Sequence, residues 1–523
     1  MPDPGLYLRT LRHLKPVQFR YRLFYTLRRQ YRRLFRFHYP MAIRAAGSPL
    51  RLMPSMRTAP CWEGDNRFAF LNLSYDFDHA IDWNFMGHSK LWAYHLNYFD
   101  YLHQVDMSEA EGLRLIRDFI QQSDCNREGM EPYPISLRVV NWIKFLSHHQ
   151  IQDEAIDASL YAQIRILLDN LEFHLLGNHL LENGFALLWG TRYFNDDRLC
   201  ATADEILQSE LEEQVLPDGA HFELSPMYHA IMLERVLDAV NLLQKTGDTA
   251  GQLLPLLRRK AALMMGWLDQ LSFANGEPPS FNDSSSGMAA DIKALQGYAT
   301  RLKIQADQVP LGASGYRILK AERYELVLDA GPIGPAYLPA HGHCDMLSFV
   351  LMVDGTPYFV DTGVSTYETG LRRQYERSTA AHNTVTMDGA EQSEVWGSFR
   401  VGRRAKIVIL IDTADQVIAQ HNGFPSIHRR RFSTRPQDIA IEDWLLPRGT
   451  GIARFHFAPH RKVFLEEDQL TCDALCMRFP KRRKVWLESY QYAVGFNRLA
   501  TGDCVCVAFD DHLLTEIDIK TAC

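Results

Sequence analysis

Residues 225–246 read SPMYHAIMLERVLDAVNLLQKT, and this stretch is typical of the whole first half of the chain. Its apolar residues recur every three to four positions, the spacing of a helix with one buried face. Pro226 suits the first helical position, which needs no backbone N–H. Ser108-Glu109-Ala110-Glu111 marks another helix start, because it forms a capping box. We predict a helical array or toroid over about residues 85–305, with further helices at 135–148, 159–176, 184–195, 202–215, 227–246 and 252–272.

After about residue 315 the apolar period changes from near 3.6 to 2, which is typical of strands. Asp354-Gly355 and Asp388-Gly389 are hairpin turn signals. Many short strands joined by turns predict a β-sandwich. The expected strands lie at 323–329, 347–353, 357–361, 406–411, 416–420, 438–446, 486–493 and 504–509.

The expected domain organisation has three parts. A basic segment covers residues 1–60, a helical domain covers 61–310 and a β-sandwich domain covers 311–523. The length of 523 residues agrees with more than one packed domain. Hydrophobic residues make up 46% and charged residues 23%, which excludes wholesale disorder and collagen-like or disulfide-scaffold classes.

The charge of the chain is unevenly distributed. The net charge is −7, yet residues 1–40 hold ten Arg or Lys against Asp3 alone. Leucines and phenylalanines alternate with these arginines, so two interpretations stay open. One is a surface helix pair that packs its apolar side on the main domain, and the other is a peripheral contact with an anionic membrane or a polysaccharide. Nucleic acid is not expected as a partner, because no recognition motif accompanies the charge.

The location of the protein is predicted from what the sequence lacks. Nine cysteines without zinc-knuckle spacing favour free thiols and a reducing compartment. No apolar run reaches the roughly 18–20 residues of a spanning helix, and the first residues lack the apolar core of a secretory signal. We expect a cytoplasmic or inner-membrane-associated protein, with a periplasmic location as the alternative. The oligomeric state stays open.

Four clusters are rich in side chains that can carry chemistry. The first is LGNHLLENG at 176–184, an Asn-His pair at a helix start, and the second is LPDGAHFELSPMYH at 216–229, a turn that leads into a helix. The third is AHGHCD at 340–345, whose histidines could serve as ligands or as a base. The fourth joins Asp361 to His382, and with a histidine of the third cluster it forms a donor set that suits Zn²⁺. The alternatives are helix capping for the first cluster, a half-buried tyrosine for the second and hydrogen-bonded core histidines for the third, while the spacing of the fourth set matches no short metal-binding motif.

In this order the clusters resemble the heparinase II/III-like polysaccharide lyases. Further similar stretches are WAYHLNY at 92–98, YPISLRVVNW at 133–142 and FNDS at 281–284. The resemblance covers most of the chain. It implies an α+β multidomain fold class, with an N-terminal (α/α) toroid followed by a C-terminal antiparallel β-sandwich and an active site where the two meet.

The resemblance also implies a reaction, which is β-elimination at a uronic acid of an acidic polysaccharide. Asn178 is the candidate group that neutralises the substrate carboxylate, with His179 beside it. Tyr228 and His341 match the acid and the base, in an order that depends on the substrate. Nearby histidines and a metal are expected to lower the pKa of Tyr228. Glu223 and Arg138 are expected to bind substrate.

A metal site is carried over by the same resemblance. It falls on His343, Asp361 and His382, and the expected cofactor is a divalent metal, Zn²⁺ first, with Ca²⁺ or Mn²⁺ as alternatives. Its expected role is to hold loops in place. The absence of a secretion signal favours a role in making or trimming a bacterial capsule or exopolysaccharide. Two other classes stay open, which are a non-catalytic glycan-binding accessory protein and a metal-dependent hydrolase with Asp345 beside the metal.

Overall fold

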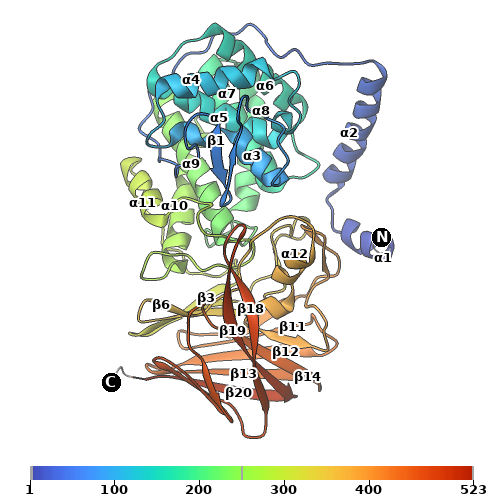
Figure 1. Cartoon of the computed structure of the whole chain (residues 1–523), viewed down its shortest axis with the longest axis vertical. Helices are drawn as coiled ribbons and strands as arrows, with labels where there is room; N and C mark the ends of the chain where they lie inside the picture. The colour runs from blue at the N-terminus through green and yellow to red at the C-terminus, as the bar shows by residue number, and fades with distance from the viewer. Residues whose placement is uncertain (1–3, 249–250, 521–523) are drawn as a thin grey trace.

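The computed structural model describes residues 4–248 and 251–520. A helical half and a β half are stacked along the long axis of the molecule, and the two N-terminal helices lie at one side (Figure 1). The linker between the halves contains no long element, since the last helix of the first half ends at Arg301 and the next strand begins at Tyr316.

The helical half consists of paired helices around one apolar core. Its capping signals are used as predicted: Ser108 Oγ accepts a hydrogen bond from Glu111 N at 3.2 Å, and Pro226 follows the N-cap Ser225. Helices α5 and α7, α7 and α8, and α9 and α10 are neighbours. The helices are α3 (Lys90–Tyr98), α4 (Glu109–Gln121), α5 (Pro132–His149), α6 (Glu154–Asp169), α7 (Gly177–Phe194), α8 (Asp197–Gln214), α9 (Pro226–Thr246), α10 (Leu253–Leu271) and α11 (Ile292–Arg301).

One predicted helix ends earlier than expected. The apolar spacing predicted a helix to residue 176, but α6 ends at Asp169 and residues 170–176 form a connection into α7. Leu176 closes this connection with φ of 66°, and Gly177 follows with φ of 62°. A leucine at positive φ is strained, and such strain clusters at functional sites.

The β half is an antiparallel sandwich, as predicted. An eight-stranded sheet has the order β10-β11-β12-β13-β20-β17-β16-β15, and two four-stranded sheets have the orders β18-β19-β14-β7 and β3-β4-β5-β6. Phe349 of β5 packs on Phe432 of β12 and on Phe455 of β14, so one ring joins all three sheets. A short helix, α12 (Leu371–Glu376), lies between β6 and β7 in the chain. The strands are β3 (Tyr316–Lys320), β4 (Tyr324–Asp329), β5 (Phe349–Val353), β6 (Thr356–Phe359), β7 (Val385–Met387), β8 (Val395–Trp396), β9 (Arg400–Val401), β10 (Ile407–Asp412), β11 (Gln416–His421), β12 (Ile427–Thr434), β13 (Asp438–Leu446), β14 (Thr450–His456), β15 (Phe464–Glu466), β16 (Gln469–Cys472), β17 (Leu475–Arg478), β18 (Lys484–Gly495), β19 (Arg498–Asp510) and β20 (His512–Ile519).

Both predicted hairpin turns are confirmed. Asp354 and Gly355 have φ of 49° and 71° between β5 and β6, and Asp388 and Gly389 have φ of 49° and 68° after β7. Two successive positive φ angles define the turn that matches the twist of paired strands.

The long β18–β19 hairpin ties the two halves together. It rises from the sandwich toward the helical half (Figure 1). There it meets the small hairpin of β1 (Arg67–Phe70) and β2 (Leu73–Asp76). Asn72 Nδ2 donates to Phe496 O at 2.9 Å, and Asn497 Nδ2 donates to Leu71 O at 2.9 Å. Phe496 is buried in the core of the helical half, which fixes the junction between the domains at this edge.

The N-terminal helices α1 (Pro4–Leu11) and α2 (Pro16–Leu34) pack on the body with polar and aromatic side chains. Tyr21 stacks on Phe173 with ring centroids 4.7 Å apart, and Gln18 Nε2 donates to Leu175 O at 3.1 Å. Arg9 of α1 forms a two-bonded ion pair with Glu394 of the sandwich. The expectation that this helix pair packs its apolar side inward is therefore wrong for α2, whose leucines point to solvent. Within the described residues, no helix is long and apolar enough to cross a bilayer.

Candidate active site

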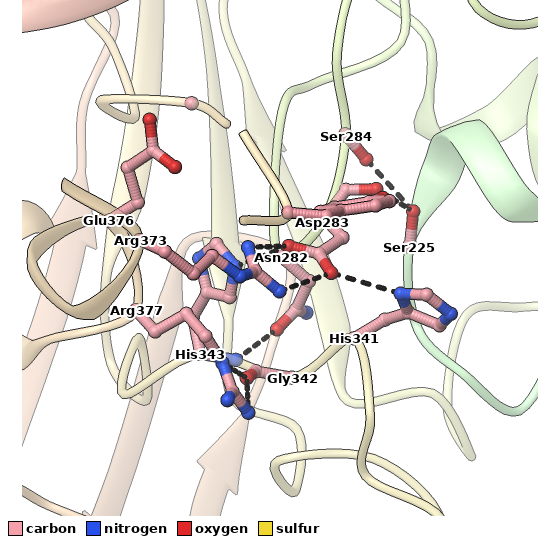
Figure 2. Close-up of polar contacts among 12 residues, drawn as sticks. Ser225, Asn282, Asp283, Ser284, His341, Gly342, His343, Arg373, Glu376 and Arg377 are labelled. Carbon is pink, nitrogen blue, oxygen red and sulfur yellow. Dashed lines mark hydrogen bonds and ion pairs between the residues drawn. The ribbon is translucent and has the colours of Figure 1, made fainter. Parts of the chain in front are cut away.

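The carboxylate of Asp283 is the centre of the candidate site. Arg373 donates to both of its oxygens, at 2.5 and 2.7 Å. His341 Nδ1 lies 2.9 Å from Oδ2 and His343 Nε2 lies 2.8 Å from Oδ1. Arg373 and His341 approach the carboxylate from opposite sides (Figure 2). Burial alone would raise the pKa of Asp283, but Arg373 and the two imidazoles hold it well below its ordinary value, so this carboxyl is ionised.

Asp283 is held in place by the helical half. Asn282 has φ of 55°, and its side chain donates to Leu224 O at 3.0 Å and accepts from His343 N at 2.8 Å. Ser225 Oγ, the N-cap of α9, donates to Asp283 O at 2.7 Å. The residues that hold the carboxylate and the groups that bind it therefore come from both halves of the protein.

His341 is oriented as a proton acceptor. Because an ionised carboxylate only accepts hydrogen bonds, the contact with Asp283 places the ring proton on Nδ1. Nε2 then carries the lone pair, and it lies 3.9 Å from Glu223 Oε2. The His341 side chain is partly exposed, whereas Asp283, His343 and Arg373 are buried. His341 is thus the imidazole of this cluster that can meet a substrate.

Tyr228 stacks on this imidazole. The two ring centroids are 3.9 Å apart, and the Tyr228 hydroxyl lies 3.3 Å from the hydroxyl of Tyr367. Burial raises the pKa of Tyr228 well above 10. The hydrogen bond with Tyr367 lowers this pKa, whereas the negative charges of Asp283 and Glu223 raise it further. The expectation that nearby histidines lower this pKa is not met, because burial and the two carboxylates outweigh the hydrogen bond with Tyr367 and the charge of Arg373. The contribution expected of a metal stays a prediction. A phenol that keeps its proton suits an acid.

Asn178 lies in the first turn of α7 and bonds to Glu223. Its Nδ2 is 3.1 and 3.0 Å from the two oxygens of Glu223. Gly177 permits this approach, since a Cβ there would lie 2.3 Å from Leu338 Cδ2 and 3.1 Å from Glu223 Oε1. Asn178, Glu223, His341 and Tyr228 therefore form one connected cluster, as the sequence predicted for a site between the domains.

His179 lies at the edge of this cluster. Its Nδ1 is 3.0 Å from Glu172 Oε1, and its ring packs on Tyr133 with centroids 4.4 Å apart. Burial lowers the pKa of His179, but Glu172, Glu223 and Glu182 together raise it by more, so the net shift is upward. The side chain remains partly exposed. A partly exposed imidazole one residue from Asn178 can meet a ligand at this edge of the cluster.

Arg138 does not belong to the site, so the prediction that it binds substrate is wrong. Its side chain is fully buried in the helical core. Nε donates to Gln163 Oε1 at 2.7 Å, Nη1 to Asn97 O at 2.9 Å and Nη2 to Gly129 O at 2.7 Å. The guanidinium also packs on the ring of Phe119. These contacts tie α5 to α3 and α6, a structural role.

The predicted metal ligands lie beside Asp283. His382 Nδ1 is 2.6 Å from Asp361 Oδ2, and the rings of His343 and His382 are 5.3 Å apart. His343 Nδ1 and His382 Nε2 are buried and have no hydrogen-bond partner among the residues that the structure describes. These two nitrogens fit a metal, while Asp361 bonds to the other nitrogen of His382. In the part of the chain that the structure describes, no three His, Cys, Asp or Glu side chains already form a metal cage.

The sequence analysis missed three members of the site. Asp283 was noted only within a similar stretch, and Arg373 and Tyr367 were not considered. Arg373 comes from α12, and Tyr367 packs on Phe496 of the β18–β19 hairpin. A buried carboxylate that bonds one arginine and two histidines has no signature in sequence spacing, because its partners lie about 60 to 90 residues away.

Fold and site together define a class: a helical toroid joined to an antiparallel sandwich, with an acid/base cluster at the junction. Residues 135–308 match the family described as Heparinase II/III N-terminus, and residues 304–511 match Heparinase II/III-like, C-terminal. The chain belongs to the heparinase II/III-like family.

Individual relatives are distant. A heparin-sulfate lyase of Bacteroides stercoris is 24% identical, and the match covers 40% of this chain and 36% of the relative. The matched region thus spans about a third of that relative's length. A crystal structure of a heparinase III is similar with a TM-score of 0.67 and 16% identity, covering 86% of this chain and 81% of that one. A heparan sulfate lyase mutant of Pedobacter heparinus gives 0.56 and 17%, covering 87% and 82%. These likenesses confirm the predicted toroid and sandwich.

Proposed function

We propose that this protein is a polysaccharide lyase that cleaves a uronic-acid-containing polymer by β-elimination. One observation carries the proposal: an imidazole whose Nδ1 is bonded to a buried carboxylate packs against a phenol ring, with the ring centroids 3.9 Å apart. A base and an acid side by side are what elimination requires, and binding alone requires neither. Family membership supports the same class of activity.

Each side chain has a defined step. His341 Nε2 takes the proton from C5 of the uronate, and the released electron pair forms the C4=C5 double bond. The bond between C4 and the glycosidic oxygen breaks, and the Tyr228 hydroxyl gives its proton to that oxygen. The two protein groups thus exchange one proton each with the substrate, and no water is consumed.

Removal of the C5 proton requires that the neighbouring carboxylate is neutralised. Asn178 Nδ2 is linked to this acid/base pair through Glu223, and the imidazole of His179 lies at the edge of the cluster. Hydrogen-bond donors aimed at the forming enolate-like oxygens stabilise the transition state. The bond between Asn178 and Glu223 places the amide there before substrate arrives.

A divalent metal is the proposed cofactor, with His343 Nδ1 and His382 Nε2 as ligands and Asp361 as the residue that completes or orients the set. Imidazole donors favour Zn²⁺ over Ca²⁺ or Mn²⁺. The metal would supply a crosslink between loops of the sandwich.

The proposed metal site predicts a metal content. Purified protein should carry about one zinc per chain by elemental analysis, and His382→Ala should lose it, because one of two free nitrogens disappears. His148→Ala, which removes an exposed histidine near the end of α5, is the control and should retain the metal. Zinc-free wild-type protein that folds normally would contradict this prediction.

The cellular role that we propose is the making or trimming of a bacterial exopolysaccharide or capsule. It rests on the family and on the basic N-terminal segment. A non-catalytic glycan-binding accessory protein is the competing function, and the same experiment separates the two.

The test is the ultraviolet absorbance of a 4,5-unsaturated uronate. Purified protein is screened against heparan-type polymers, hyaluronate, chondroitin, alginate and bacterial exopolysaccharides. We expect a rise with at least one uronate polymer, and a loss of about 10²–10⁴-fold in Tyr228→Phe, which keeps the ring but not the proton. Binding of a polymer by wild type without any rise in absorbance would favour the accessory function.

A further inference from the structure

Helix α2 presents an apolar stripe to solvent along its whole length. Its inward side carries Gln18, Tyr21, Tyr25, Arg28 and Arg32, which contact the 169–175 connection or Tyr39. The opposite side repeats at three- to four-residue spacing and is exposed: Leu23 by 62%, Leu27 by 56% and Leu34 by 77%, with Phe19 and Tyr31 in the same row. We name this set the α2 stripe. An apolar row of this kind on the surface marks a binding surface rather than a core.

Every charged side chain carried by α2 is positive. Residues 4–62 contain no Asp or Glu. Arg20, Arg29 and Arg33 are exposed on α2, and none of them forms an ion pair within the described residues. A helix with leucines and aromatics on one side and arginines around them is built for the boundary between lipid headgroups and acyl chains. An acidic polysaccharide offers the charge but no apolar phase for the leucines.

We propose that the α2 stripe binds the surface of an anionic phospholipid bilayer. The helix would lie in the plane of the headgroups with Phe19, Leu23, Leu27, Tyr31 and Leu34 inserted. The stripe is not long and apolar enough to cross a bilayer, in agreement with the absence of a spanning helix among the described residues. This proposal does not depend on lyase activity.

The position of α2 connects the membrane to the candidate site. Its inward side rests on residues 171–175, and α7 with Asn178 begins two residues later. At the elbow between α1 and α2, Lys15 pairs with Glu213 of α8 and lies 4.0 Å from the ring centroid of Tyr337 in the β half. The N-terminal helices thus contact both halves through side chains. A bilayer bound at α2 would place the junction of the two halves close to a polymer at the membrane surface.

The experiment is sedimentation of the full chain with lipid vesicles. Vesicles of phosphatidylcholine alone are compared with vesicles that contain phosphatidylglycerol. We expect binding to the anionic vesicles only, lowered about tenfold or more by Leu23→Ser with Leu27→Ser. Each of Arg29→Gln and Arg33→Gln should lower binding about fivefold. Val105→Ser, an exposed valine of the helical half, is the matched control and should bind like wild type.

Several results would overturn the proposal. Equal binding by wild type and by the leucine variant would show that the stripe is not inserted. An absence of vesicle binding, with a dimer that the leucine variant abolishes, would assign the stripe to a second copy of the chain. If only the arginine variants lose vesicle binding, and an acidic polysaccharide displaces the wild-type protein from vesicles, the surface would be assigned to glycan binding. Circular dichroism and chromatography confirm that each variant is folded.

Discussion

His341→Ala lowers kcat/KM for the uronate polymer by about 10²–10⁴-fold, the usual contribution of one general base. The loss follows from geometry, since Nε2 is the free ring nitrogen of the partly exposed histidine at Asp283. The production of the unsaturated product is measured by absorbance, with polymer binding measured separately. We expect binding to persist, because His341 acts on a proton rather than on the sugar hydroxyls.

Chemical rescue separates a base from a structural residue. Exogenous imidazole should restore part of the activity of His341→Ala, because the ring space beside Tyr228 is then empty. The same imidazole should not affect Tyr228→Phe, which lacks the acid. A variant with normal kcat and a raised KM would assign His341 to substrate binding and would leave the base unidentified.

The fold was predictable wherever apolar residues set the period. Helices α5 and α9 follow from apolar residues at helical spacing, strand β13 follows from alternation, and strand β5 follows from an unbroken apolar run. Strand β12 did not, because its inward positions include His428 and Arg430 rather than aliphatic residues. Both side chains bond to Asp443 of β13, at 2.7 Å each. A buried ion pair breaks the apolar pattern, and only the paired strand explains it.

The site was predictable in its chemistry and not in its connections. Asn178, Tyr228 and His341 were found by motif, yet the group that organises His341 was not. The spacing of residues along the sequence cannot show that Arg373 and His341 reach one carboxylate, because only the tertiary structure brings them together. The same limit explains Arg138, whose charge suggested a ligand and whose partners are buried carbonyl and amide oxygens.

For α2 the sequence predicted the helix but not which of its sides is buried. Periodicity identified an amphipathic helix, and the general rule places the apolar side inward. Its inward side instead uses tyrosines and arginines, since the connection at 169–175 offers backbone carbonyls and the Asp169 carboxylate. The partner surface decides which side of a helix is buried.

Asp283→Asn is expected to lower kcat by about 10²–10⁴-fold with little change in KM. Asparagine can donate from its amide, so His341 can adopt the other tautomer, with the proton on Nε2 and no lone pair toward the substrate. The loss would equal that of removing the base itself. Asp283 is thus a positioning residue, and the steady-state constants of the folded variant measure its role.

Asp283→Asn is also expected to lower the stability of the fold, and a second substitution separates this effect from the effect on catalysis. Without the carboxylate, Arg373 remains buried and unpaired, which costs about 3–5 kcal/mol of unfolding free energy. Asp283→Asn with Arg373→Met removes both charges and should recover most of that stability in denaturant melts, while kcat stays low. If the double variant regains both stability and kcat, Asp283 serves only to neutralise Arg373. If it regains stability alone, the carboxylate acts on catalysis through the tautomer of His341.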